Sequence, residues 1–458
     1  MKKIVLAFAL LVVACPAFEM NGKNPLTDQK DYPEALFTLG NMATVELEIP
    51  EKTWQNIVAK ASDKTYHECD ITINGERFGH VGVRTKGASS LDDVVIMKSN
   101  RYSFTLNLNK FEKGQKYHGL SKLQLNNNIW DATQMKDAIV YDMCRFIGLP
   151  APLANYARIM LNGEFFGCYL LVEPVEKNFC RRNYADKESN IYKPYHNLAY
   201  TGDDVKQYSD IADFAKVNGD KASVQRVIAA LKSVDEGADI EAHVDVENVM
   251  KYMALQTMVV NFDSMTGHNA QNYYLREADG KISLIPWDYN LAWGGYPDEE
   301  LDFEDEGPMD CLPTDGGVRS KEEVSKIVNF PIDEPFSCDL GKRTFFMKLL
   351  ANEQYKAMYY HYLDILCDKY ILGGEFNKTL DVINNEIGEV AGTEANAFYT
   401  NEQYHKAQQT LRLLLEKRAA SVLGQINGSL PSTWEGQQAQ PQLLINSDDI
   451  NLQDLGGI

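Results

Sequence analysis

A short β-hairpin with an aspartate on each side of it constrains the fold of this chain more than any other sequence feature. Residues 272–275 and 281–285 have the composition of two short strands, and Asp279-Gly280 between them is a dipeptide that favours a tight hairpin turn. Asp263 ends an apolar run before the hairpin, and Asp288 ends another after it. In both places we expect the carboxylate to face a pocket rather than bulk water.

Two carboxylates placed around a hairpin suit phosphoryl transfer. One carboxylate orients and deprotonates the acceptor hydroxyl, and the other holds Mg²⁺ against the phosphates. Protein kinases place a metal-binding Asn about five residues after the catalytic Asp, whereas Asn272 follows Asp263 by a longer loop. The alternative is structural: Asp263 caps a helix end and Asp288 occupies a turn before Gly294-Gly295.

Length and charge limit the class of protein. At 458 residues the chain exceeds one ordinary domain, so two lobes or two domains are expected. The net charge of −20 argues against nucleic acid or an anionic membrane surface as a partner. An acidic protein suits cations or Lys- and Arg-rich polypeptides, although acidity also serves solubility alone.

The first residues have the pattern of an export signal. Met1-Lys2-Lys3 is followed by an apolar stretch, residues 4–13, that is too short to span a bilayer. Residues 12–15 resemble a bacterial lipobox, which favours a signal peptide over residues 1–14 and a lipid on Cys15. Ordinary cleavage after Ala14 or Ala17 is the alternative. Either way we expect an exported protein, at the cell surface or secreted, that meets the membrane only through this anchor.

The remaining cysteines do not indicate a metal site. They include no CxxC pair and no zinc-site spacing. Cys144 and Cys168 lie in apolar contexts and are expected to be small buried side chains. One or two disulfides elsewhere remain an alternative in an exported chain.

The order of predicted elements gives an α+β fold. After a tether over residues 15–40, residues 41–180 form a β-rich N-lobe with hairpin turns at Asn74-Gly75 and Asn162-Gly163 and one long helix over residues 131–147. Residues 181–428 form a mainly helical C-lobe, and residues 429–458 form a mobile tail. This is roughly the order of a bilobed kinase. Strands are predicted at residues 44–49, 69–73, 79–84, 102–108, 120–125, 157–161 and 167–173, and helices at residues 222–234, 245–260, 343–350, 353–370 and 402–426.

A second group of candidates follows a predicted strand. Arg84 and Lys86 run into Gly87, Ser89 and Ser90, which places two cations beside a flexible, hydroxyl-bearing turn. Backbone N–H groups and cations together bind phosphate oxygens, although a solvated strand end has the same composition.

Three further features each have a functional and a structural interpretation. Glu173 either meets the base of a nucleotide or caps a strand before Pro174. Lys193 lies either in the cleft or on its rim. The acidic run over residues 298–306 is either a docking surface for Lys- or Arg-rich substrates or an exposed loop. No HExxH, GxSxG or Walker sequence is present, which disfavours metalloproteases, α/β-hydrolases and P-loop proteins.

Taken in order, these segments resemble the CotH (spore coat protein H) kinase-like family of secreted and surface atypical protein kinases. The segments are residues 83–90, 123–127 with Asp131, 161–173, 191–193, 261–263, 272–275 and 285–288. The resemblance implies transfer of the ATP γ-phosphate to Ser or Thr of an exported protein substrate, with Mg²⁺ or Mn²⁺. It implies that Asp263 is catalytic and that Asp288, Asn272 and Asn290 hold the metal. Nucleotide binding would fall to Arg84, Lys86, Ser89, Ser90, Glu173 and Lys193.

Two departures from the family pattern bear on activity. The family usually has Trp-Asp-x-Asp, whereas this chain has Trp287-Asp-Tyr-Asn290. The family also tends to carry Lys in the strand after the Ser-Ser turn, where residues 102–106 have none, so Lys86, Lys98 or Lys193 would replace it. The alternative function is a non-catalytic pseudokinase that acts as a surface or spore-coat assembly scaffold. A carboxylate-metal phosphohydrolase is a third, weaker hypothesis.

Overall fold

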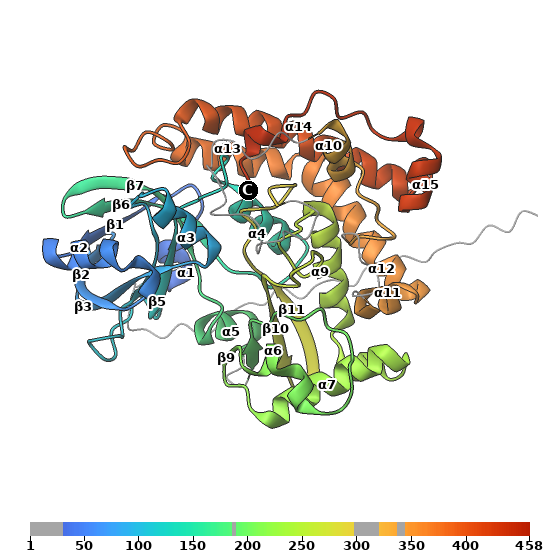
Figure 1. The fold of residues 1–458 in the computed structure, drawn as a ribbon, viewed down its shortest axis with the longest axis horizontal. Coiled ribbons are helices and arrows are strands. Elements are labelled where there is room, and N and C mark those ends of the chain that lie inside the picture. Colours follow the sequence, from blue (N-terminus) through green and yellow to red (C-terminus); the bar gives the residue numbers. More distant parts are fainter. Residues whose placement is uncertain (1–30, 186–188, 297–319, 337–343) are drawn as a thin grey trace, which may run out of the picture.

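A β-barrel forms one side of the molecule. The computed structural model describes residues 31–185, 189–296, 320–336 and 344–458. Within them, seven strands close into a barrel in the order β1-β2-β3-β4-β5-β7-β6, on the left in Figure 1. β1 and β6 pair in parallel and the other neighbours are antiparallel. The strands are β1 (Ala43–Glu48), β2 (His67–Ile73), β3 (Glu76–Lys86), β4 (Ser103–Asn107), β5 (Lys122–Asn126), β6 (Ala154–Leu161) and β7 (Glu164–Val172).

Two of the barrel hairpins turn where the sequence predicts. Asn74 and Gly75 have φ values of 48° and 88°, and Asn162 and Gly163 have values of 51° and 86°. Both residues of each turn are therefore left-handed, which a two-residue hairpin of this kind requires and which Asn and Gly tolerate best. These two predicted hairpins are confirmed.

A second sheet carries the acid-flanked hairpin. Its strand order is β11-β10-β8-β9, formed by β8 (Asn190–Tyr192), β9 (Ala215–Val217), β10 (Tyr273–Ala278) and β11 (Lys281–Pro286). Helices α7 (Lys221–Glu236) and α9 (Val246–Val259) pack on β11. The side chain of Asn248 in α9 bonds both to the N–H of Leu284 (2.7 Å) and to its carbonyl (3.1 Å). The hairpin is thereby fixed to the helix that precedes Asp263.

Helices form the other side of the molecule. The buried guanidinium of Arg418 joins them, because it donates to the carbonyls of Thr257, Val328 and Phe330. The helix predicted over residues 353–370 is present, and it is π-helical from Ile365 onward. The elements are α10 (Lys321–Val328), α11 (Thr344–Leu350), α12 (Glu353–Asp364), the π-helix η4 (Ile365–Ile371), α13 (Glu375–Ile387) and α14 (Asn401–Ile426).

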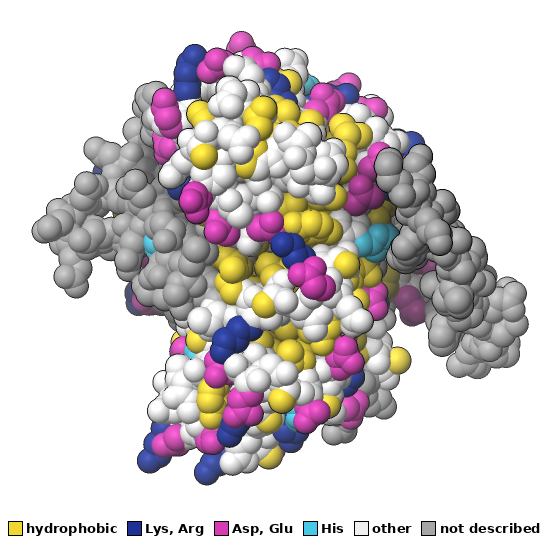
Figure 2. Space-filling model, turned by 90° about the vertical axis from the view of Figure 1, so that its right-hand side faces the viewer, with side chains coloured by type: hydrophobic (Ala, Val, Ile, Leu, Met, Phe, Trp, Pro, Cys, Tyr) yellow, Lys and Arg dark blue, Asp and Glu magenta, His cyan; other side chains and the backbone are white. Residues whose placement is uncertain are grey.

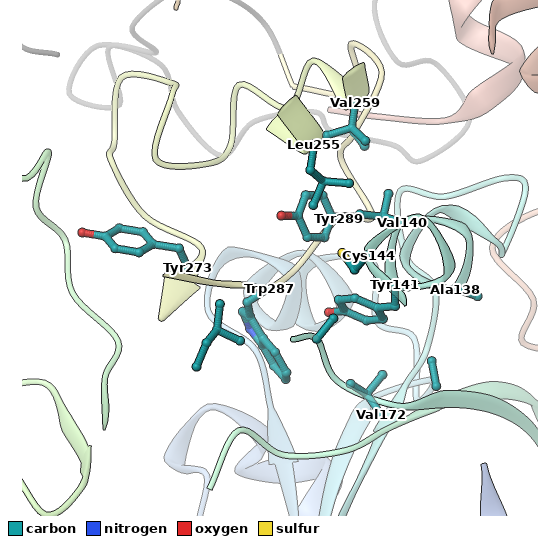
Figure 3. Packing of buried hydrophobic residues seen from close by; sticks show 14 of the residues in the cluster. Ala138, Val140, Tyr141, Cys144, Val172, Leu255, Val259, Tyr273, Trp287 and Tyr289 are labelled. Atoms are coloured by element: carbon teal, nitrogen blue, oxygen red, sulfur yellow. The ribbon is translucent and has the colours of Figure 1, made fainter. Parts of the chain in front are cut away.

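The predicted long helix, α4 (Lys136–Phe146), connects the two sides. It contacts β6 of the barrel as well as α9 and α13. Figure 3 shows Tyr141 and Cys144 of α4 packed near Tyr289, the residue that follows Asp288. The rings of Tyr141 and Tyr289 meet edge to face, 6.1 Å apart. Cys144 and Cys168 are buried free thiols, as expected.

The described chain also has short helical elements, none of which is among the predicted helices. They are α1 (Tyr32–Leu36), α2 (Glu51–Ala59), η1 (Ala61–Asp63), α3 (Ser89–Ile96), α5 (Lys177–Tyr184), η2 (Val205–Tyr208), α6 (Ser209–Ala212), α8 (Ile240–His243), α15 (Trp434–Ala439), η5 (Pro441–Leu443) and η6 (Leu452–Leu455).

Both expected flexible ends need correction. The tether was expected to reach residue 40, but α1 begins at Tyr32 and buries Tyr32 and Leu36. The expected tail, residues 429–458, instead packs against the rest of the molecule and buries Leu452 and Leu455. A few apolar side chains therefore suffice to hold a segment whose average composition is polar.

Some expectations fall outside the described residues. These are the signal peptide and lipid site within residues 1–30, the acidic run over residues 298–306, and Cys311 and Cys338. Of the helices in the described part of the chain, none combines the length and apolar character needed to cross a membrane.

Candidate active site

A cavity of about 500 Å³ brings most of the predicted site residues together. Its walls come from β3, β4 and β5 of the barrel, from the loop that follows β5, and from the two loops that carry Asp263 and Asp288. The predicted residues that line it are Arg84, Lys86, Ser89, Ser90, Lys193, Asp263, Asn272, Asp288 and Asn290.

Asp263 lies in a sharp turn after α9. The turn begins at Val260, whose φ of 43° is unusual for a β-branched residue and marks local strain. Both oxygens of the buried Asp263 carboxylate accept side-chain amides, from Gln271 at 2.5 Å and from Asn272 at 2.8 Å. Burial raises the pKa of Asp263 to about 7, against the lowering effect of the Gln271 hydrogen bond.

Asp288 follows β11 in a left-handed conformation, with φ of 67°. Its N–H donates to the hydroxyl of Tyr141 (3.3 Å), and its carbonyl accepts from the side chain of Asn261 (3.3 Å). Because Asn261 also receives the N–H of Asp263 (3.1 Å), one amide side chain joins the loops of the two aspartates. The relative position of the two aspartates is therefore fixed by the fold.

Cations and carboxylates both line the cavity, so it is not acidic as the chain as a whole is. Lys86 lies at the end of β3, where its ammonium donates to Asn126. Burial lowers the pKa of Lys86 and of Lys193, and nearby Asp288 opposes the shift in both. Basic side chains at the walls are Lys64, Arg84, Lys86, Lys193 and Lys216, and acidic ones are Asp137, Glu176, Asp263 and Asp288. The helical face in Figure 2 also shows acidic and basic side chains interspersed.

Glu173 is not brought into the cavity. Its buried carboxylate accepts from Tyr32 (2.5 Å) and from Arg182 (2.6 Å), and it also receives the N–H of Leu153 (3.2 Å). The expected nucleotide contact is therefore corrected: the residues of this segment that line the cavity are the next three, Pro174 to Glu176. Lys98 also lies apart, exposed beside a separate hollow between α3 and the segment before α14.

Asp137 lines the cavity and was not predicted. It is the second residue of α4, and its carboxylate accepts the N–H of Tyr289 at 2.8 Å. Burial, together with the charge of Asp288, raises the pKa of Asp137 to about 7. The available signal was an acidic residue in the first turn of a predicted helix, but helix capping explains that position equally well.

The protein atoms supply only part of a metal site. Among the described residues, no three His, Cys, Asp or Glu side chains gather closely enough to hold an ion. The amide nitrogen of Asn272 donates to Asp263, and that of Asn290 donates to the carbonyl of Ile129 (3.1 Å). A divalent ion at Asp288 would need phosphate oxygens to complete its shell, as in kinases.

This site and the comparisons with known proteins together define a kinase-like protein. The model of the CotH kinase protein family matches residues 83–422, which is more than half of the chain. The chain therefore belongs to the CotH kinase protein family.

Individual relatives are more distant. Inner spore coat protein H of Bacillus subtilis (strain 168) is 25% identical over 203 residues, a match that spans 40% of this chain and 53%, about half, of that protein. A structure of the Shewanella oneidensis MR-1 toxin–antitoxin system HipA, HipB and operator DNA aligns with 76% of this chain and 73% of its own, at 13% identity. Its TM-score of 0.32 is too low to establish a shared fold.

Proposed function

We propose that this protein is an exported, bilobed kinase that transfers the γ-phosphate of ATP to Ser or Thr of a protein substrate. The proposal rests on one observation: Asp263 and Asp288 line a single cavity together with Arg84, Lys86 and Lys193. Phosphoryl transfer requires one carboxylate to accept the proton of the acceptor hydroxyl and another to hold the metal. It also requires cations that bind the phosphates.

The residues present fit ATP and a divalent cation. A cavity of about 500 Å³ is within the range of small-molecule sites, roughly 300–1,000 Å³. Arg84, Lys86 and Lys193 would face the phosphates, with Ser89 and Ser90 at the turn beside them. Asp288, with the side-chain oxygen of Asn290, would hold Mg²⁺ or Mn²⁺. When bound, the ion neutralises charge on the phosphate oxygens.

Asp263 is the proposed general base. Its carboxylate is oriented by the neutral side-chain amides of Gln271 and Asn272. The charge of nearby Lys193 lowers the pKa of Asp263 less than burial raises it. A pKa near 7 lets Asp263 accept the proton of an acceptor hydroxyl near neutral pH. The role proposed for Asn272 is to orient the Asp263 carboxylate.

Location and substrate are proposed more broadly. The signal-like residues 1–14 and the lipobox at Cys15 support export and a lipid anchor at the cell surface. The net charge of −20 supports a Lys- or Arg-rich protein substrate and disfavours nucleic acid. The name of the Bacillus subtilis relative places that protein in a spore coat.

One observation favours the non-catalytic alternative. The amide of Asn290 is used within the fold, where it donates to Ile129. A site with one metal carboxylate fewer than the family pattern binds Mg²⁺ more weakly, and a scaffold that binds ATP without transfer would tolerate that loss.

Labelling with γ-³²P-ATP tests the proposal. Purified protein is incubated with Mg²⁺ or Mn²⁺ and a Lys- and Arg-rich acceptor protein. Asp263→Asn is compared with Asp279→Asn, which changes an exposed residue in the turn between β10 and β11. We expect labelling by the wild type and by Asp279→Asn but not by Asp263→Asn. Binding of ATP with no transfer to any acceptor or to the protein itself would support the pseudokinase instead.

A further inference from the structure

Residues 452–458, which we call the strap, lie against two loops that form walls of the cavity. The strap begins as the short helix η6 and continues through Gly456 and Gly457 to Ile458. Figure 1 shows this end of the chain, marked C, between the barrel and the helices.

The strap bonds to both wall loops. The N–H of Ala132 donates to the carbonyl of Leu455 (3.2 Å), and the N–H of Ile458 donates to the carbonyl of Gly295 (2.9 Å). Ala132 lies two residues beyond the wall loop of residues 127–130, and Gly295 belongs to the loop that carries Asp288.

The same two loops also meet at the cavity, where Asn290 donates to Ile129. They are therefore joined twice, once beside the site by a side chain and once behind it by the strap. The first loop is held on another side as well, because the indole of Trp130 donates to Asp93 of α3 (3.1 Å). That helix begins at Ser89, one of the proposed phosphate contacts.

The approach of the strap is close enough to require glycine. A Cβ on Gly456 would lie 2.7 Å from the carbonyl oxygen of Trp130 and 2.6 Å from the hydroxyl of Tyr399. A Cβ on Gly457 would lie 2.7 Å from the carbonyl oxygen of Gly295. Separations below 3 Å force the loops or the strap to move.

A helix anchors the strap from the opposite side. Asp454 forms an ion pair with Lys406 (2.8 Å) and accepts from Thr410 (3.1 Å), both on α14. The strap thus connects a long, packed helix to the two cavity loops.

We propose that the strap is a positioning element of the proposed ATP and metal site. It fixes the spacing of the two loops and thereby the positions of Asn290 and Asp288. This inference rests on the proposed function for its consequence in ATP binding. Its geometric part, the spacing of the loops, is testable without any ligand.

Gly456→Ala is the test, and Gly428→Ala is its control for an alanine at a positive φ. Gly456 and Gly428 both have positive φ values, 70° and 78°. Gly456 also has ψ of 174°, a conformation that residues with a Cβ rarely adopt, so alanine there strains the backbone of the strap in addition to any contact that its Cβ makes. A Cβ on Gly428 meets nothing within 4 Å. Gly456→Ala therefore disturbs the strap and its contact with the wall loop, whereas Gly428→Ala adds a side chain at a positive φ without touching either.

Hydrogen exchange measured by mass spectrometry reports how often the backbone amides of the two loops open. In Gly456→Ala we expect exchange in residues 127–132 and 288–295 to be faster by about tenfold, and in Gly428→Ala to match the wild type within about twofold. Equal exchange in both variants would overturn the inference, whatever the protein binds.

ATP binding then tests the consequence. We expect Gly456→Ala to weaken binding of ATP with Mg²⁺ by about tenfold and to change binding of ATP with EDTA much less, because the displaced groups are those proposed for the metal. Loosened loops with unchanged Mg²⁺-dependent binding would overturn the positioning role. A wild type that binds no ATP would overturn the proposed function. The exchange experiment would then still show whether the strap fixes the two loops.

Asp454→Asn is the milder variant for use if Gly456→Ala does not fold. It weakens the anchor to Lys406 without introducing a clash. We expect the same two loops to exchange faster, by a smaller factor, and an unchanged pattern would count against the strap.

Discussion

The side-chain amide of Asn272 donates twice to Asp263, to the carboxylate at 2.8 Å and to the backbone carbonyl at 2.9 Å. Gln271 occupies the other carboxylate oxygen. The carboxylate is therefore fixed in direction by two neutral groups, while burial keeps its pKa high. A group held in this way suits the transfer of a proton better than the permanent binding of a cation.

Asp263→Asn removes the proposed base and keeps the shape of the side chain. We expect the rate of phosphate transfer to fall by about 10²–10⁴-fold, the usual contribution of a general base, while ATP binding is retained. Radiolabel incorporation and ATP titration measure the two effects. Transfer that persists at more than a tenth of the wild-type rate would remove Asp263 from this role.

The pH dependence of transfer has a predicted sign. Asp263 acts as the carboxylate, and burial raises its pKa to about 7, so the rate at saturating ATP should rise with pH up to about 7 and level off above. Gln271→Leu removes a hydrogen bond that lowers this pKa. The ascending limb should therefore move to higher pH in Gln271→Leu. A limb that stays in place, or moves to lower pH, would contradict the assignment.

Lys86 and Lys98 form a matched pair of lysines. Lys86 lines the cavity with Asp288, whereas Lys98 is exposed beside another hollow. Lys86→Met should weaken ATP binding by roughly 10–100-fold, since hydrogen bonds to charged groups contribute about 1.5–3 kcal/mol. Lys98→Met should leave binding unchanged. Isothermal titration with ATP measures the affinity of both variants. An equal loss of affinity in the two would mean that a place in the cavity wall does not identify the phosphate contacts.

Asn290→Asp restores the family pattern but conflicts with the structure. The amide of Asn290 donates to the carbonyl of Ile129, and a carboxylate there would place two acceptors together. We expect a loss of stability of about 1–3 kcal/mol and no gain in transfer rate. Thermal unfolding and radiolabel assays check both. A variant as stable as the wild type and faster in transfer would show that the Ile129 bond is dispensable.

Local patterns in the sequence predicted much of the fold. Asn-Gly pairs identified two barrel hairpins, because few other residues accept two successive left-handed conformations. The acid-flanked hairpin identified Asp263 and Asp288 from another local pattern. Each aspartate follows an apolar run, and such a run ends at the edge of a core. Barrel closure through the parallel pair of β1 and β6 was not predictable, since it depends on contacts far apart in the chain.

The errors have the same origin. Glu173 ends a strand beside the cavity, but its partners Tyr32 and Arg182 come from segments with no visible link to it in the sequence. The strap belongs to residues 429–458, whose polar average composition predicts a mobile tail. Its few apolar residues, Leu452 and Leu455, acquire meaning only when the wall loops lie beside them.

A nucleotide-titrated thermal shift of the wild type and Asp288→Asn, with Mg²⁺ and with EDTA, tests the central claim that the cavity binds ATP with a metal ion held by Asp288. At a hundredfold excess over Kd, bound ATP should stabilise the wild type by roughly 2.7 kcal/mol in the presence of Mg²⁺. We predict that Asp288→Asn loses the Mg²⁺-dependent part of this shift and keeps the part seen in EDTA. An identical shift in both proteins, or no shift in the wild type under either condition, would contradict the account.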